Sequence, residues 1–189
     1  LALALRFVFS ATYSNNAETK LLKFCKESSP TDNKIHGMNR SMLKNPYNLP
    51  KPELLMPAGS PDKLRFAYAY GADAVYAGVP LFSLRARENE FNFAKLKEAR
   101  ELATQLNKKL YFTINVIPHN TRIPLFARDL DTIMSLKPDA LIMADPGLIS
   151  MVKEKYPESV IHLSVQANVV NYQSVKFWKN FGISRIILS

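Results

Sequence analysis

Short apolar runs alternate with amphipathic stretches from residue 53 to the end of the sequence. The apolar runs lack an in-and-out alternation, which is typical of parallel strands buried on both faces. Between them, apolar residues recur every three or four positions, as in helices that pack on a sheet. The predicted strands are 54–56, 74–77, 110–114, 140–144, 160–165 and 184–188, and the predicted helices are 63–70, 93–106, 124–136, 145–155 and 168–181.

The first helix has the clearest boundary signals. Ser60 is a good N-cap, Pro61 suits the first helical position, and Asp62 places a negative charge where the helix dipole favours it. Gly71 closes the helix as a residue that tolerates the left-handed conformation. Together with the flanking apolar runs, these residues predict one complete βαβ unit.

Six strands joined by five helices predict a parallel α/β fold with right-handed crossovers. An open doubly wound sheet and a closed (β/α) barrel both satisfy this pattern. A weak internal repeat of residues 72–78 at 138–145 favours the barrel, and so do the polar residues that follow every strand. We therefore predict a TIM-barrel-like domain that is incomplete, with about six of the eight βα units.

Residues 1–50 differ in amino-acid composition from the rest of the chain. They are rich in Ser, Asn, Thr and Lys and are predicted to be a disordered or non-native extension, whereas residues 51–189 form the amino-terminal part of the barrel. The apolar start of the extension is too short to cross a membrane. Organellar targeting is one interpretation of the scarce acidic residues, but a translated upstream extension of a cytoplasmic protein is favoured.

Composition narrows the ligand classes. The net charge of +9 is compatible with an anionic partner such as a nucleic acid, although many enzyme surfaces carry a similar surplus. Cys25 is the single cysteine, which excludes an internal disulfide and a multi-cysteine metal site within the chain and suggests a reducing compartment. The three histidines lack metal-ligand spacing, and no nucleotide-binding glycine pattern is present. We predict no metal and no cofactor within these residues.

The segments that follow the predicted strands are rich in amides and arginines. In either α/β architecture these loops form the ligand crevice, so their polar side chains are candidates for substrate binding. The candidates are Tyr76, Arg85, Arg87, Asn115, Asn120, Ser164, Gln166, Asn168 and Asn171. Arg85 and Arg87 lie two positions apart, so an extended loop would direct both to one carboxylate or phosphate. The alternative is that they pair with Glu88 and Glu90.

His119 and Asp145 are the candidate catalytic residues. His119 could act as a general acid or base, although a loop histidine held by a neighbouring carbonyl is as common. Asp145, which precedes Pro146 and Gly147, is first of all a helix N-cap. Ser164, Gln166 and Asn168 alternate at the end of the predicted fifth strand, which would place their polar groups on one face.

Five segments, taken in order, resemble the amino-terminal half of the peptidase U32 family, also called the collagenase-like protease family. They are 53–60, 70–78, 83–92, 138–147 and 162–168. The likeness is greatest to the bacterial branch of the family that hydroxylates tRNA. It covers residues 52–189 and leaves residues 1–50 without a counterpart.

This resemblance implies prephenate-dependent hydroxylation of the wobble uridine of tRNA to 5-hydroxyuridine. It implies tRNA and prephenate as partners, and an iron–sulfur cluster held by four cysteines in a carboxyl-terminal part that this sequence lacks. The chain alone is therefore expected to be inactive. A collagenase-like peptidase and hydroxylation in ribosomal RNA or in ubiquinone biosynthesis are the alternatives that the family leaves open.

Overall fold

The computed structural model describes residues 34–35, 38–39, 52–85 and 88–188 of the chain. The packing of its Cα atoms divides the chain into Leu1–Pro52 and Glu53–Ser189. In the first unit, β1 (Lys34–Ile35) pairs antiparallel with β2 (Met38–Asn39). The remaining predictions for the extension lie outside the described residues.

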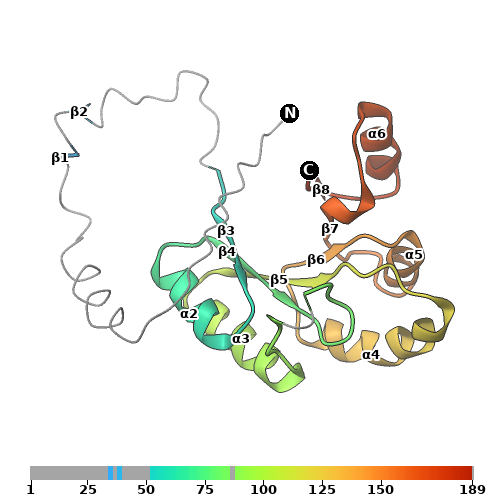
Figure 1. The fold of residues 1–189 in the computed structure, drawn as a ribbon, viewed down its shortest axis with the longest axis horizontal. Coiled ribbons are helices and arrows are strands. Elements are labelled where there is room, and N and C mark those ends of the chain that lie inside the picture. The colour runs from blue at the N-terminus through green and yellow to red at the C-terminus, as the bar shows by residue number, and fades with distance from the viewer. Residues whose placement is uncertain (1–33, 36–37, 40–51, 86–87, 189) are drawn as a thin grey trace. The chain divides into compact units, whose positions relative to one another are not determined.

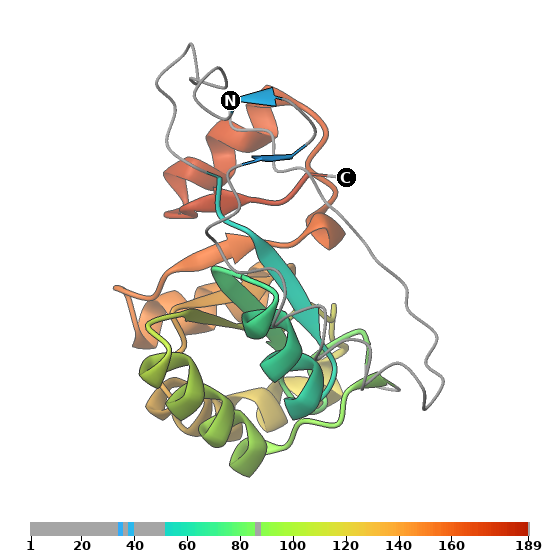
Figure 2. The same ribbon diagram turned by 90° about the vertical axis from the view of Figure 1, so that its left-hand side faces the viewer.

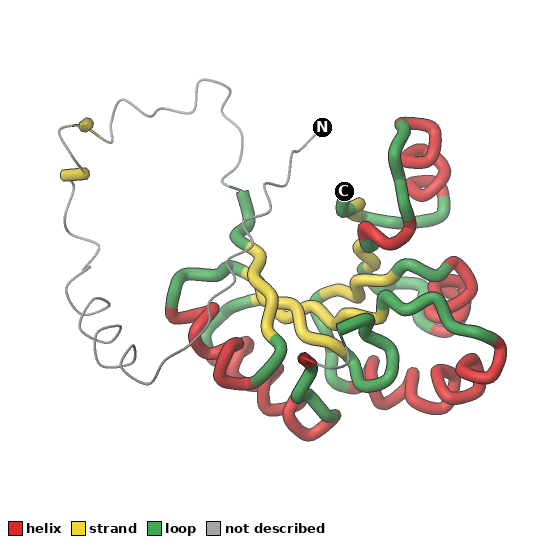
Figure 3. The backbone as a smooth tube through the Cα atoms, viewed as in Figure 1, coloured by secondary structure: helices red, strands yellow, loops and turns green. Residues whose placement is uncertain are grey.

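Strands and helices alternate throughout the second unit (Figures 1 and 3). In chain order the elements are β3 (Leu55–Ala58), α2 (Pro61–Ala69), β4 (Ala74–Gly78), α3 (Phe93–Gln105), β5 (Lys109–Ile114), the 3-10 turn η3 (Asn120–Arg122), α4 (Ile123–Ser135), β6 (Ala140–Met143), α5 (Pro146–Lys155), β7 (Ile161–Leu163), the 3-10 turn η4 (Val165–Ala167), α6 (Tyr172–Asn180) and β8 (Arg185–Ile186). Each predicted strand and helix has a counterpart here.

The strand order separates the two predicted architectures. The strands are all parallel, and the sheet runs β3-β4-β5-β6-β7-β8, so each strand pairs with its neighbours in the sequence. A doubly wound sheet reverses its order at a switch point, whereas a barrel does not. The sheet curls, with helices α2 to α5 on its convex side (Figures 1 and 2). The prediction of a partial TIM-barrel-like fold is confirmed.

Alternate residues of each strand pack on opposite faces of the sheet. On β5, Leu110, Phe112 and Ile114 are fully buried in the main core, which also contains the apolar residues of the helices. Burial of such a side chain contributes roughly 1.5–3 kcal/mol. The residue between the first two, Tyr111, belongs to a smaller cluster on the other, concave face. That cluster contains Ala74, Tyr111, Ala140 and Ile142, with Leu55, Tyr76 and Ile187 packed against it.

The first βαβ unit follows its boundary signals. The Ser60 hydroxyl accepts a hydrogen bond from the backbone N–H of Lys63 at 3.3 Å, and Pro61 begins α2. Gly71 has a φ of 92°, which a residue with a Cβ rarely adopts. The predicted cap and stop of this helix are confirmed.

The fifth predicted strand is too long. It was expected over 160–165, but β7 ends at Leu163 and a 3-10 turn follows. The cause lies in Ser164, whose hydroxyl accepts a hydrogen bond from the backbone N–H of Gln166 at 3.4 Å. Such local side-chain bonds compete with a continuing strand. The predicted alternation of polar residues on one strand face is therefore wrong for this segment.

The fifth predicted helix begins later than expected. Asn168 has a left-handed φ of 52°, which a helix cannot contain. Asn171 then caps α6, because its side-chain oxygen accepts a hydrogen bond from the N–H of Ser174 at 2.9 Å. The helix consequently starts at Tyr172 rather than at 168.

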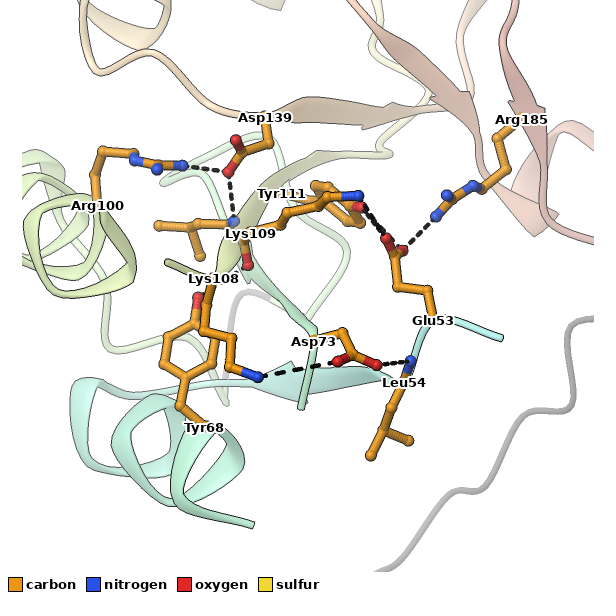
Figure 4. Close-up of polar contacts among 11 residues, drawn as sticks. Glu53, Leu54, Tyr68, Asp73, Arg100, Lys108, Lys109, Tyr111, Asp139 and Arg185 are labelled. Atoms are coloured by element: carbon orange, nitrogen blue, oxygen red, sulfur yellow. Dashed lines mark hydrogen bonds and ion pairs between the residues drawn. The ribbon is translucent and has the colours of Figure 1, made fainter. Parts of the chain in front are cut away.

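The internal repeat places one aspartate before β4 and another before β6. The Asp73 carboxylate accepts a hydrogen bond from the N–H of Leu54 at 2.8 Å, and the Asp139 carboxylate accepts one from the N–H of Leu110 at 2.7 Å (Figure 4). Asp139 also pairs with Arg100 of α3. In both halves of the repeat, the aspartate ahead of one strand binds the backbone at the start of the preceding strand.

Candidate active site

The loop from β4 to α3 packs against the turn after β3. The backbone N–H of Glu90 donates to the carbonyl of Gly59 at 2.8 Å. A Cβ at Gly59 would lie only 2.4 Å from the carbonyl oxygen of Glu88, so a glycine is required for this approach. The loops that follow β3 and β4 thus form one packed unit at the carboxyl ends of these strands. We call the loops at the carboxyl ends of the strands the rim of the barrel.

Asn89 and Gly78 fix the interior of the same loop. The Asn89 side-chain amide donates to the Gly78 carbonyl at 2.9 Å and accepts from the N–H of Phe91 at 3.2 Å. A Cβ at Gly78 would lie 2.8 Å from Cβ and Oγ of Ser83. Neither Asn89 nor the buried Ser83 was predicted as a site residue. The sequence did place both in the polar loop after a strand, which is the one signal that points to them.

The loop after β5 holds the next part of this rim. The side-chain oxygen of Asn115 accepts a hydrogen bond from the N–H of Leu84 at 3.1 Å, and Arg122 donates to the carbonyl of Leu81 at 3.1 Å. These bonds fix the backbone immediately before Arg85, whose side chain is exposed. Asn115 therefore positions the arginine loop in this structure.

Arg85 is an available cation on the rim. In the described part of the chain it forms no ion pair with Glu88, and Lys95 donates instead to the carbonyl of Glu90. Arg87 lies outside the described residues, so the two-arginine clamp stays a prediction. A guanidinium without an internal partner can bind a carboxylate or phosphate through two parallel hydrogen bonds.

His119 and Asn120 lie at the start of η3, and both are exposed. The His119 side chain makes no capping hydrogen bond, while its carbonyl accepts from the N–H of Arg122 at 2.9 Å. An exposed imidazole on this loop can reach a ligand at the rim, and its role as an acid or base stays a prediction.

Asp145 caps α5, as its position before a proline indicated. Its carboxylate accepts a hydrogen bond from the N–H of Leu148 at 2.8 Å. One carboxylate oxygen is thus used by the helix, and the second is left for other contacts. The structure assigns Asp145 a capping role and leaves its catalytic role a prediction.

The remaining candidates after β7 differ in exposure. Ser164 is buried, whereas Gln166, Asn168 and Asn171 are exposed. The N–H of Ser164 donates to the carbonyl of Met143 at 2.7 Å, which ties this loop to β6. The exposed amides are the groups that a ligand over this part of the rim can reach.

Tyr76 and Thr113 lie on strands rather than on loops. Tyr76 is half-buried and packs with the concave-face cluster, next to Tyr111 in the register of β4 and β5. Thr113 is 6% exposed, and its hydroxyl has no hydrogen-bond partner among the described residues. Thr113 is not among the predicted site residues, because a threonine inside an apolar strand also satisfies strand propensity.

The described residues contain no group of three or more His, Cys, Asp or Glu side chains that could hold a metal ion. The same residues include no helix that is long and apolar enough to cross a membrane. What the rim offers is an exposed guanidinium, exposed amides and one exposed imidazole. This set suits recognition of an anion and transfer of a proton.

Comparisons with known proteins agree with the fold and with the resemblance. The chain is 58% identical over 139 residues to tRNA hydroxylation protein P of Haemophilus influenzae, and 55% identical over 139 residues to that of Escherichia coli. These matches cover 74% of this chain, and 30% and 31% of the two relatives. The chain therefore spans about a third of the length of these relatives.

A solved structure agrees with the fold, and a sequence profile identifies the family. The structure of the U32 peptidase Mk0906 has a TM-score of 0.59 and 13% identity, covering 73% of this chain and 58% of that chain. At this identity the likeness concerns the fold alone. The profile of Peptidase family U32 matches residues 59–189, which include the rim loops described above. With this match and the identity to the two bacterial relatives, the chain belongs to Peptidase family U32.

Proposed function

We propose that this chain forms the barrel portion of a tRNA-hydroxylating protein. The observation that carries the proposal is the 58% identity over 139 residues to a protein named tRNA hydroxylation protein P. The matched part contains the packed rim, with its exposed Arg85 and amide side chains. A cytoplasmic location, where tRNA is available, belongs to the same proposal.

The finer reaction in this proposal is hydroxylation of the wobble uridine to 5-hydroxyuridine, with prephenate as co-substrate. Prephenate carries carboxylates and tRNA carries phosphates, and guanidinium groups bind both in a bidentate manner. Arg85 is exposed and forms no ion pair with another residue that the structure describes, which supports an anion at this rim. The chain's own contribution is to bind and orient that anion, while His119 is placed to hold or move a proton.

The iron–sulfur cluster implied by the family does not fit the residues of this chain. A cluster of this kind is held by four cysteine thiolates, and Cys25 is the single cysteine here. We place the cluster in another part of the whole protein and assign no step through it. We accordingly expect residues 1–189 alone to form no product.

The proposal is tested by a chimera in a strain that lacks the relative. Residues 53–188 of this chain replace the matching third of the Escherichia coli relative, and 5-hydroxyuridine in tRNA is measured by nucleoside mass spectrometry. Restored 5-hydroxyuridine is expected from the chimera and none from residues 1–189 alone. Unchanged tRNA would contradict the proposal. Restored hydroxylation of ribosomal RNA, or restored ubiquinone, each measured in a strain that lacks that activity, would transfer the function to the alternatives within the family.

Arg85→Ala in the same chimera tests the anion site. We expect product to fall at least tenfold, because a charge-assisted hydrogen bond contributes about 1.5–3 kcal/mol. The melting temperature should stay nearly unchanged, since Arg85 forms no ion pair among the described residues. Arg65→Ala is the matched control, because Arg65 is an exposed arginine of α2 that pairs with Asp62 of the same helix. Equal product from both variants would remove Arg85 from the site.

A further inference from the structure

A pocket lies at the amino ends of the strands, opposite the rim. Its volume is about 390 Å³. The residues that line it belong to the amino ends of β5, β6, β7 and β8 or directly precede these strands. They are Lys109, Tyr111, Asp139, Val160, His162, Ser184 and Arg185.

Two cations of this pocket share a single carboxylate. Arg185 donates to Glu53 at 2.7 Å and Lys109 donates to it at 3.0 Å (Figure 4). The Tyr111 hydroxyl donates to the same carboxylate at 2.9 Å. Asp139 adds no free negative charge, because it pairs with Arg100. The cluster therefore keeps one positive charge in excess.

The donor groups also outnumber the acceptors. A guanidinium has five N–H groups and an ammonium has three, whereas a carboxylate has about four acceptor positions. Glu53 already receives hydrogen bonds from Arg185, Lys109 and Tyr111. Most N–H groups of the two cations thus have no protein acceptor among the described residues. The Lys109 and Arg185 side chains are 56% and 41% exposed, so water solvates these N–H groups and an anion can replace it.

His162 lines the same pocket and is almost fully buried. It is 4% exposed, and its Nδ1 atom has no hydrogen-bond partner among the described residues. Its ring stands edge-on to Tyr111, with centroids 4.8 Å apart. Burial, followed by the charge of Arg185, lowers the pKa of His162 to about 4, so the imidazole is neutral at neutral pH and keeps one N–H to donate. An unpartnered buried polar atom calls for a ligand or a water molecule.

We propose that this pocket binds a small oxyanion, a phosphate or carboxylate group, through Arg185, Lys109 and a ring N–H of His162. The excess positive charge, the surplus of donors and the unpartnered imidazole all favour an acceptor-rich anion. The excess positive charge disfavours a metal cation, and the polar lining disfavours an apolar ligand. The site lies at the amino ends of the strands and is separate from the rim that carries Arg85.

The test uses residues 1–189 and two probes, inorganic phosphate and acetate, with chloride at matched ionic strength as the reference. The ring resonances of His162 are assigned by their loss in His162→Phe and are followed by NMR during titration. A saturable shift with at least one probe is expected, and chloride should give none. A response to phosphate alone, or to acetate alone, identifies the anion class. No shift, or a shift that never saturates, overturns the proposal.

Charge variants separate a binding site from a structural cluster. Arg185→Gln should weaken binding roughly tenfold or more, because it removes a charge-assisted contact. Glu53→Gln should strengthen binding, because it removes the competing carboxylate while leaving both cations. Arg65→Gln removes an arginine far from the pocket and should leave binding unchanged. Weaker binding in Glu53→Gln, with hydrogen exchange at Ser184 and Ile187 on either side of β8 unchanged, would contradict the site.

Discussion

Single side chains at the rim serve the fold and are available to a ligand at the same time. Asp145 uses one oxygen to cap α5, and Asn115 uses its oxygen to hold Leu84. Sequence position predicted that both follow a strand. It could not predict which of their oxygen atoms accept hydrogen bonds from backbone N–H groups, because that depends on loop geometry.

Asp145→Asn separates capping from chemistry. Asparagine caps a helix about as well as aspartate, whereas alanine does not, so Asp145→Ala should cost about 1 kcal/mol of unfolding free energy and Asp145→Asn almost none. Urea unfolding of residues 1–189 measures both. In the chimera, product formation by Asp145→Asn then reports on chemistry alone. Full activity in Asp145→Asn would restrict Asp145 to its capping role.

His162 should make the stability of the protein depend on pH. Its pKa is lowered from 6.5 to about 4 by burial and by Arg185, so between these values the unfolded chain binds more protons than the folded one. The free energy of unfolding therefore falls as the pH drops through this window, by roughly 1–2 kcal/mol from about pH 7.5 to about pH 5. Urea unfolding at the two pH values measures this loss.

His162→Phe is expected to remove most of that pH dependence, since phenylalanine keeps the ring contact with Tyr111 and cannot be protonated. His119→Phe, at an exposed position, is the control. The comparison stays above about pH 5, because the lowered pKa of Glu53 makes its own stabilising effect disappear only below 4.5. The same pH dependence in His162→Phe as in the wild type would assign the effect to another group.

At the scale of elements, periodicity predicted most of the barrel. The strands that are buried on both faces have apolar runs that no surface segment would carry, and the caps of α2 and α5 are local in sequence. The apolar runs and the helix caps are each formed by a few neighbouring residues of the sequence. They were sufficient to predict the order of strands and helices and the cap and stop of α2, although β3 runs through Pro57 to Ala58, beyond the predicted end at residue 56.

The loops were harder to predict because their structure depends on distant residues. The approach of Gly59 to Glu88 and the bond from Asn115 to Leu84 join positions that are far apart in the sequence. The end of β7 and the start of α6 were misjudged from local signals. Ser164 could continue a strand or cap a turn, and the left-handed Asn168 delays the helix to Tyr172.

The aspartates of the internal repeat should contribute more to stability than surface aspartates do. Asp139→Ala removes the hydrogen bond from Leu110 and leaves Arg100 without its partner, so a loss of about 1–3 kcal/mol is expected. Asp62→Ala is the matched control, because Asp62 forms an exposed pair with Arg65 of the same helix that contributes about 0.2–0.5 kcal/mol. Urea unfolding compares the two variants. If Asp139→Ala and Asp62→Ala lost the same free energy of unfolding, Asp139 would contribute no more to stability than a surface aspartate.

At the scale of the whole barrel, Glu53 connects its first and last described strands. It precedes β3 and binds Lys109 and Tyr111 of β5 and Arg185 of β8. Burial alone would raise the pKa of Glu53, but the hydrogen bonds from these three side chains outweigh it and lower the pKa to about 2. The carboxylate is therefore ionised at neutral pH and links strands that the sheet itself does not pair.

A double-mutant cycle of Glu53→Gln and Arg185→Gln measures this link. Because the Arg185 side chain is 41% exposed, solvent screens the pair, and we expect a coupling of about 0.5–1.5 kcal/mol rather than the larger value of a buried pair. Glu53→Gln should also speed hydrogen exchange at Ser184 and Ile187, whose N–H groups bond to β7, more than at Leu110 of β5. The Asp62 and Arg65 pair is the reference for an exposed contact. If Glu53 and Arg185 couple no more strongly than that pair, and exchange at β8 is unchanged, only backbone hydrogen bonds to the neighbouring strands hold β3 and β8 in the sheet.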